Sequence, residues 1–136
     1  MKDKDCIFCL LANGDIPTSV VYEDDDLTVI LDAGPAAQGH ALVLPKEHYK
    51  NITKVPEGLA GRLMSTAAKI GAAQMKALGA DGFNVLVNTN EAAGQTVFHC
   101  HVHVIPRFNG DNVMQPWTPG EVKDGAALAA KIASAL

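Results

Sequence analysis

Aromatic residues make up only 5% of this 136-residue chain, and no hydrophobic run approaches the roughly 18 residues of a membrane-spanning helix. The start, MKDKDCIFCLLANGD, has too short an apolar segment for a signal peptide. Lysine and arginine form no block and the net charge is −4, which argues against a long polyanion such as DNA as a partner. We therefore expect a cytoplasmic protein that binds neither nucleic acid nor membrane.

Cysteine is also scarce, with three residues and no pattern typical of an exported disulfide framework. We expect these residues to be free thiols or metal thiolates. The composition, 48% hydrophobic and 19% charged, is that of a globular protein, and the length suits one domain over residues 1–136 that buries its own core.

Hydrophobic periodicity predicts an α+β domain. We expect helices over residues 5–14, 56–79 and 126–136, and strands over 19–23, 27–32, 40–45, 82–88 and the segment HCHVHVIP at 99–106. Asp5 can cap the first helix, and Gly79 suits the end of the long one. Most loops between strands are short, which favours an antiparallel sheet. One layer of helix leaves the other face of such a sheet uncovered, so self-association is expected.

Three of the five histidines, His99, His101 and His103, occupy every second position of one segment. Alternation with this period is typical of a strand, so the imidazoles are predicted to share one face, opposite the apolar residues Phe98, Cys100, Val102 and Val104. A single histidine of this kind is usually a partly buried residue with one hydrogen-bond partner. Three side chains roughly 6.6 Å apart cannot all be protonated without strain. Neutral imidazoles in a row indicate a site for nucleophilic, acid–base or metal chemistry.

The pattern His-φ-His-φ-His-φ-φ, where φ is apolar, resembles the signature of the histidine triad family of nucleotide hydrolases and transferases. The similarity extends to GQTVF before the motif, PR after it, GHALVLPKEH at 39–48 and DIP at 15–17, so it covers residues 5–108 and leaves a variable tail at 109–136. The resemblance implies a HIT-like fold, in which an antiparallel sheet with one long helix and short terminal helices continues edge to edge across a homodimer.

The resemblance also implies a reaction at the α-phosphate of a nucleotide that carries a leaving group. By motif position, His101 is expected to be the nucleophile that forms a nucleotidyl-imidazole intermediate, which water then hydrolyses. His103, Gln95 and Thr96 correspond to phosphate donors, and Asn88 matches a position near the phosphate. His40 corresponds to a fourth histidine that orients the others, although a loop-end residue capping backbone groups would look the same from the residue alone.

For the nucleoside, the resemblance makes Asp32 the ribose-binding acid. Four apolar positions correspond to a slot for the base, which we take to be a purine: Ile7, Phe8, Ile16 and Leu42. Plain core packing accounts for these four nearly as well. An apolar slot discriminates poorly among bases, so the base preference stays open.

Cys6 and Cys9, in CIFC, are close enough to hold one metal ion together near a helix start. Their spacing alone leaves three readings: a zinc pair, two unrelated buried thiols, and a redox pair, for which the expected βαβ surroundings are missing. Family members with this motif use two histidines to complete a tetrahedral zinc, and the matching positions are His48 and His99. A closed Cys₂His₂ set implies structural zinc. If zinc holds His99, this member of the row is no longer available as a base, and catalysis falls on His101 and His103 with His40 nearby.

Two functions follow. The first is a nucleotide hydrolase that acts on a nucleoside phosphoramidate, an aminoacyl adenylate or a dinucleoside polyphosphate and releases the monophosphate. The alternative is a nucleotide-binding, zinc-stabilised interaction module with little or no turnover. A pure binder has no need of a nucleophile at position 101, so the intact triad favours the enzyme.

Overall fold

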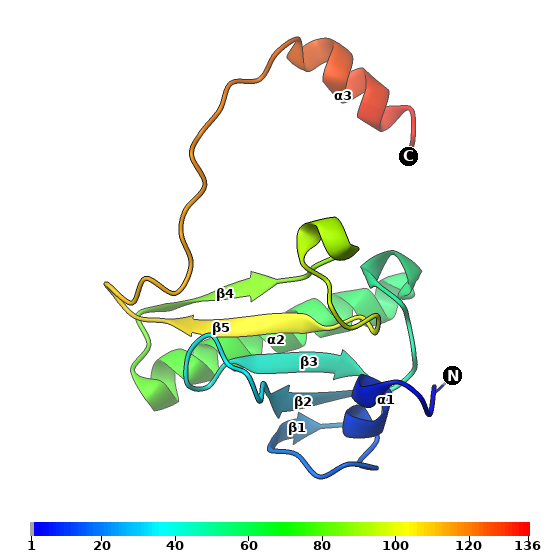
Figure 1. Cartoon of the computed structure of the whole chain (residues 1–136), viewed down its shortest axis with the longest axis vertical. Helices are drawn as coiled ribbons and strands as arrows, with labels where there is room; N and C mark the ends of the chain where they lie inside the picture. Colours follow the sequence, from blue (N-terminus) through cyan, green and yellow to red (C-terminus); the bar gives the residue numbers. More distant parts are fainter. Residues whose placement is uncertain (1) are drawn as a thin grey trace.

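The structure is a computed structural model that describes residues 2–136. All strands in this part of the chain belong to a single sheet. Its five strands lie in the order β1 (Val20–Glu23), β2 (Leu27–Leu31), β3 (Ala41–Pro45), β5 (Val102–Arg107) and β4 (Gly82–Leu86). Every neighbouring pair is antiparallel. The expected α+β fold with five antiparallel strands and three helices is confirmed (Figure 1).

The long helix α2 (Glu57–Leu78) covers one face of the sheet (Figure 1). It begins after Pro56, and Gly79 ends it in the left-handed conformation, with φ 70°. Leu63 and Ala67 are buried on its inner side. They pack with alternate residues of the sheet, namely Leu27, Val29, Ala41, Val43, Val102 and Val104, to form the main core.

The short helix α1 (Ile7–Ala12) lies against the opposite face, where Ala12 packs with Ile30, Leu42 and Leu44. The hydroxyl of Thr28 donates to the Ala12 carbonyl at 2.6 Å and ties the end of α1 to β2. The expectation that Asp5 caps this helix is wrong, because the cap is Cys6, whose sulfur accepts the Cys9 N–H at 3.3 Å.

The row of histidines does not lie in one strand, as the alternation predicted. The ladder of β5 begins at Val102, so only His103 belongs to it, while His99 and His101 precede it in an irregular segment. The N–H of Cys100 donates to the carbonyl of Tyr49, in the connection after β3, instead of to a strand. The expectation that Phe98 joins the apolar face is also wrong, since it is 42% exposed, whereas Cys100, Val102 and Val104 are buried as predicted.

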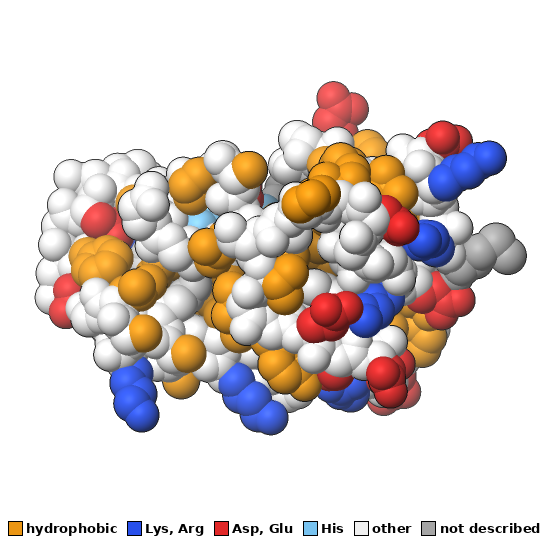
Figure 2. Space-filling view, turned by 90° about the horizontal axis from the view of Figure 1, so that it is seen from below, with side chains coloured by type: hydrophobic (Ala, Val, Ile, Leu, Met, Phe, Trp, Pro, Cys, Tyr) orange, Lys and Arg blue, Asp and Glu red, His pale blue; other side chains and the backbone are white. Residues whose placement is uncertain are grey.

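Three short elements complete the chain: η1 (Ile52–Lys54), η2 (Glu91–Ala93) and α3 (Gly125–Ala133). After β5 the chain runs away from the sheet in an extended segment and ends in α3 (Figure 1). The predicted apolar side holds Leu128, Ile132 and Leu136, all exposed, but α3 ends at Ala133, so Leu136 lies beyond the helix. On the face of the molecule in Figure 2, acidic, basic and hydrophobic side chains are interspersed. Among residues 2–136 no helix is both long and apolar enough to cross a membrane.

Candidate active site and metal cluster

Three of the predicted catalytic histidines converge on the sheet face that carries α1. His103 is on β5, where it lies opposite Leu42 of β3, and His40 directly precedes β3. The rings of His101 and His103 have centroids 4.9 Å apart, and His40 Nε2 lies 2.9 Å from His103 Nδ1. The structure therefore brings His40 to His101 and His103. His40 is about 60 residues away from them in the sequence.

Hydrogen bonds fix the proton position on His101. Its Nδ1 lies 2.7 Å from the carbonyl oxygen of His99. A carbonyl only accepts, so Nδ1 carries the proton and the neutral ring keeps a free lone pair on Nε2. Within residues 2–136 this Nε2 has no hydrogen-bond partner, on a side chain that is 7% exposed. An unprotonated, unpaired imidazole nitrogen is what a nucleophile requires.

His103 is held in the opposite tautomer. The N–H of Ala36 donates to His40 Nδ1 at 3.0 Å, so the proton of neutral His40 is on Nε2 and is donated to His103 Nδ1. His103 consequently carries its own proton on Nε2. The two adjacent rings thus offer different groups, a lone pair on His101 and an N–H donor on His103.

Burial keeps all three rings neutral near pH 7. Burial lowers the pKa of His101 and of His40 below the usual range of histidine. The negative charge of Asp32 acts in the opposite direction on both pKa values, but burial is the larger effect. Burial, followed by the charges of His101 and His40, lowers the pKa of His103 to about 4. Neutrality is what the tautomer assignments above require.

Asp32, the predicted ribose acid, lies at the edge of this group. Its Oδ2 is 3.7 Å from His40 Nε2, and its Oδ1 accepts the N–H of Gly34 at 2.8 Å. One carboxylate oxygen is therefore used in the turn after β2 while the other faces the histidines. Its role as a ribose ligand stays a prediction.

Three of the four predicted phosphate donors lie in the loop between β4 and β5 and differ in how free their polar groups are. Gln95 is buried, and its amide is taken up by backbone groups of this loop and of Lys50, with distances from 2.8 to 3.2 Å. Asn88, just beyond the end of β4, approaches the Gly94 carbonyl at 3.5 Å, and Thr96 is exposed. The structure thus shows Gln95 shaping the loop, while donation to a phosphate by these three residues stays a prediction.

The four residues predicted to form the base slot differ in burial. Leu42 is buried in the small core beneath α1, and Phe8 packs against that core and sets its ring edge against His101, with centroids 4.8 Å apart. Ile7 is 45% exposed on α1, and Ile16 is partly buried after it. Leu42 is therefore explained by packing, whereas Phe8 contacts the rings of His101 and His99, and Ile7 lines a cavity beside Cys6 and His48.

The predicted metal ligands Cys6, Cys9, His48 and His99 form one cluster, with their donor atoms all within 4.8 Å of one another. His99 Nδ1 lies 3.4 Å from the sulfur of Cys6 and 3.3 Å from that of Cys9, and His48 Nδ1 lies 3.3 Å from Cys9. Tetrahedral zinc with bonds of about 2.1 and 2.3 Å separates such donors by about 3.6 Å. The donor set and its spacing therefore fit a zinc ion.

The surroundings of this cluster prepare it for a cation. His99 Nε2 donates to the Pro45 carbonyl at 2.9 Å, which leaves Nδ1 unprotonated and aimed at the sulfurs. Burial lowers the pKa of His99 to about 4, so the ring is neutral as a ligand must be. Burial also raises the pKa of the Cys9 thiol to about 11, and this thiol needs a bound cation to ionise near neutrality.

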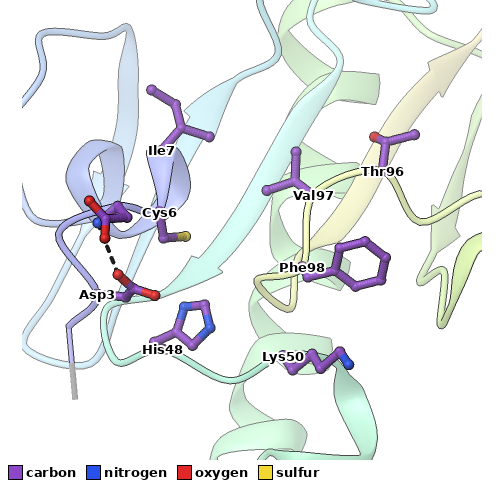
Figure 3. Close-up of a pocket in the computed structure, with 9 residues that line it drawn as sticks. Asp3, Cys6, Ile7, His48, Lys50, Thr96, Val97 and Phe98 are labelled. Carbon is purple, nitrogen blue, oxygen red and sulfur yellow. Dashed lines mark hydrogen bonds between the residues drawn. The ribbon is translucent and has the colours of Figure 1, made fainter.

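A cavity of about 480 Å³ flanks this metal cluster, away from the pair His101 and His103. Figure 3 shows Cys6 and His48 on one side of it and Thr96, Val97 and Phe98 on the other. The ammonium group of Lys50 lies 5.7 Å from the centre of the Phe98 ring. The cavity thus joins the metal cluster to the loop that carries the predicted phosphate donors.

One supporting residue escaped the sequence analysis. Gln74 of α2 is buried, and its amide nitrogen donates to the carbonyls of Gly39 and Val104, both at 3.0 Å. These carbonyls flank His40 and His103, so Gln74 braces both histidine-bearing strands from behind the sheet. A signal was available, because Gln74 falls seven residues after Ala67 on the apolar side of the helix, where a polar residue needs buried partners.

Comparison with known proteins identifies the family. The HIT domain model matches residues 13–110, and the chain therefore belongs to the histidine triad family. The adenylylsulfatase HINT3 of Arabidopsis thaliana is 43% identical over 107 residues, which are 79% of this chain and 54% of that protein. The chain thus spans about half the length of this relative.

Two solved structures are similar over nearly the whole chain. A HIT family protein from Bacillus anthracis has a TM-score of 0.89 at 34% identity, covering 98% of both chains. A Zn-bound histidine triad family protein from Mycobacterium smegmatis has a TM-score of 0.77 at 38% identity, covering 96% of this chain and 97% of the other. The expected family and fold are confirmed.

Proposed function

We propose that this protein is a nucleotide hydrolase that acts at the α-phosphate of an activated nucleoside monophosphate. The observation that carries the proposal is the pair of opposite tautomers on His101 and His103. A lone pair beside an N–H donor suits attack on a phosphorus whose oxygens gain negative charge in the transition state. A site that only bound nucleotides would need donors but no free nucleophile.

The reaction consists of two displacements. In the first, His101 Nε2 bonds to the α-phosphorus while the leaving group departs with the electron pair of its bond and, where it is basic, takes up a proton from solvent. The ring becomes positively charged, and the His99 carbonyl on Nδ1 stabilises that charge. In the second, water attacks the phosphorus and gives up a proton to solvent, the electron pair of the P–N bond returns to His101 Nε2, and the nucleoside monophosphate leaves. His103 donates to the phosphate oxygens in both steps.

The substrate class is a purine nucleotide whose leaving group is an amine, an acyl group or a phosphate. Phosphoramidates, aminoacyl adenylates and dinucleoside polyphosphates are of this kind. Adenylyl sulfate joins this set because a relative is named an adenylylsulfatase. All four share the same α-phosphate chemistry and differ in the group that departs. We propose zinc as a structural ion on Cys6, Cys9, His48 and His99, in a cytoplasmic protein.

We also propose a homodimer. The extended tail holds α3 away from the sheet, with Leu128 and Ile132 exposed on it (Figure 1). An isolated helix of nine residues is marginal in water, so its apolar side needs a cover. A second copy of this chain supplies that cover in our proposal.

The test compares the wild type with His101→Asn on adenosine 5′-phosphoramidate, diadenosine tetraphosphate and adenylyl sulfate in parallel, with AMP release followed by chromatography. We expect the variant to lose at least a thousandfold in turnover, since the nucleophile is removed, while AMP affinity measured by calorimetry changes little. The substrate with the highest kcat/KM identifies the leaving group. Full turnover by the variant would contradict the mechanism, and AMP binding without His101-dependent turnover on any substrate would support the interaction module.

A further inference from the structure

The metal cluster and the proposed nucleophile are joined through one residue. His99 directs its imidazole at the sulfurs of Cys6 and Cys9, and its backbone carbonyl accepts the Nδ1 proton of His101 at 2.7 Å. The position of this carbonyl therefore depends on what holds the His99 side chain. The same carbonyl decides which nitrogen of His101 is free.

A second connection runs through α1. Cys6 caps this helix and Cys9 lies in its first turn, so a metal ion on both sulfurs anchors the helix to the sheet. Between the two ligands, Phe8 sets its ring edge against the His101 ring, with centroids 4.8 Å apart and an interplanar angle of 84°. An aromatic edge against the imidazole restrains rotation of His101 about its own side chain.

The segment around His99 gains little support from the sheet. It lies before the start of β5, and the N–H of Cys100 goes to the carbonyl of Tyr49, directly after the ligand His48. The Pro45 carbonyl and the sulfurs are the polar contacts of the His99 ring. Side-chain contacts at the metal cluster therefore hold the segment around His99 in place, whereas hydrogen bonds of the strand ladder hold His103.

We infer that the cluster of Cys6, Cys9, His48 and His99, with its metal ion bound, positions His101 for reaction, through the His99 carbonyl and the Phe8 ring. His99 and Phe8 are positioning residues in this scheme. The inference rests on the proposed function for its effect on turnover, but the orientation of His101 can be observed without it. Loss of the metal ion should make the His101 ring more mobile under conditions in which the domain is still folded.

The experiment uses a pair of variants at His48, a ligand whose ring contacts His99 at a centroid distance of 5.2 Å and which is not among the groups described around His101. His48→Ala leaves three ligands and should lose zinc on dialysis, whereas His48→Cys restores a four-ligand set. Zinc content, kcat and the AMP dissociation constant are measured for both, with folding checked by circular dichroism. The wild type receives the same zinc additions as a control.

We expect kcat of zinc-depleted His48→Ala to fall about tenfold, the size of effect that loss of one positioning hydrogen bond produces. Added zinc and the His48→Cys variant should each restore it to within about twofold. A role of the metal in fold alone would weaken AMP binding through α1 and leave kcat at saturating substrate unchanged. An unchanged kcat in folded, zinc-depleted protein would overturn the inference.

The second readout is the ¹⁵N spectrum of the His101 ring. With zinc we expect one set of signals with the proton on Nδ1, and after depletion signals averaged over both tautomers. A single Nδ1 tautomer that persists in folded, zinc-free protein overturns the inference even if no substrate is ever turned over. If depleted protein unfolds, Phe8→Leu, which keeps all four ligands, replaces it: broadened His101 signals support the inference and unchanged ones overturn it.

Discussion

Acidification should destabilise this protein through His103. The ring has a pKa of about 4 in the folded chain, against 6.5 for an ordinary histidine, because burial and the charges of His101 and His40 disfavour its protonated form. Both folded and unfolded chains leave His103 neutral above pH 6.5. As the pH falls from 6.5 to 4, the unfolded chain takes up the proton and the folded chain does not, so the free energy of unfolding falls.

The size of this loss follows from the two pKa values. Linkage gives about 1.4 kcal/mol at pH 5.5 and about 2.5 kcal/mol at pH 4.5, relative to pH 7.5. Below pH 4 the loss levels off, because the folded protein then binds the proton as well. With a urea dependence of about 2 kcal/mol per molar, the loss at pH 4.5 lowers the unfolding midpoint by about 1 M.

The assay is urea unfolding at pH 7.5, 5.5 and 4.5 for the wild type and for His103→Asn. The amide of asparagine occupies the place of Nδ1, where it can still accept from His40 Nε2, and it does not titrate. Between pH 7.5 and 4.5 the wild type should lose about 2.5 kcal/mol more than the variant. All other groups, the metal ligands included, titrate in both proteins. Parallel losses, equal to within about 0.5 kcal/mol, would refute the argument that half-buried His103 stays neutral.

Three further predictions concern packing, metal and tail. Gly71→Ala should destabilise the domain by about 1–3 kcal/mol in urea, since an added methyl would lie 2.3 Å from the Phe83 ring, whereas Gly61→Ala, with nothing within 4 Å, should stabilise it by about 0.5–1 kcal/mol. Elemental analysis of protein purified without chelator should find about one zinc per chain, and two freely titratable thiols at Cys6 and Cys9 without zinc would remove the metal proposal. Deletion of residues 121–136 should leave the thermal midpoint of the domain within a few degrees in dilute monomer and halve the mass measured by light scattering, and an unchanged mass would show that no dimer depends on α3.

The regular elements could be predicted because each follows from a local pattern. The apolar side of α2, with Leu63 and Ala67 buried, repeats at the helical period, and Pro56 and Gly79 mark its ends. Strands β2 and β3 are largely apolar, as buried strands are, and β4 is partly buried. Strand β1 is exposed throughout, and its β-branched and aromatic residues marked it as a strand. The metal cluster was likewise reached through the motif, because its four ligands matched family positions.

What could not be predicted depends on contacts between distant segments. The alternation through His99, Cys100 and His101 is that of a strand, yet the ladder with β3 pairs only Val102 to Val104. Side-chain period reports which way residues point and not which backbone groups are bonded. Gln95 shows the same limit, since the motif marked it as a phosphate donor while the fold uses its amide within the loop.

The three histidines of the motif have the same side chain, but each has a different partner that fixes its proton. The carbonyl of Pro45 accepts a hydrogen bond from His99 Nε2, so the lone pair of Nδ1 faces the metal cluster. Another carbonyl, that of His99, accepts a hydrogen bond from His101 Nδ1 and leaves a lone pair on Nε2, the nitrogen that we propose as the nucleophile. A donor, the Nε2–H of His40, occupies His103 Nδ1 and leaves an N–H on Nε2. The roles that we propose for them, metal ligand, nucleophile and phosphate donor, therefore fall on one residue type at two-residue steps. In a neutral imidazole one nitrogen carries the proton and the other a lone pair, so the partner of one nitrogen decides what the other nitrogen offers.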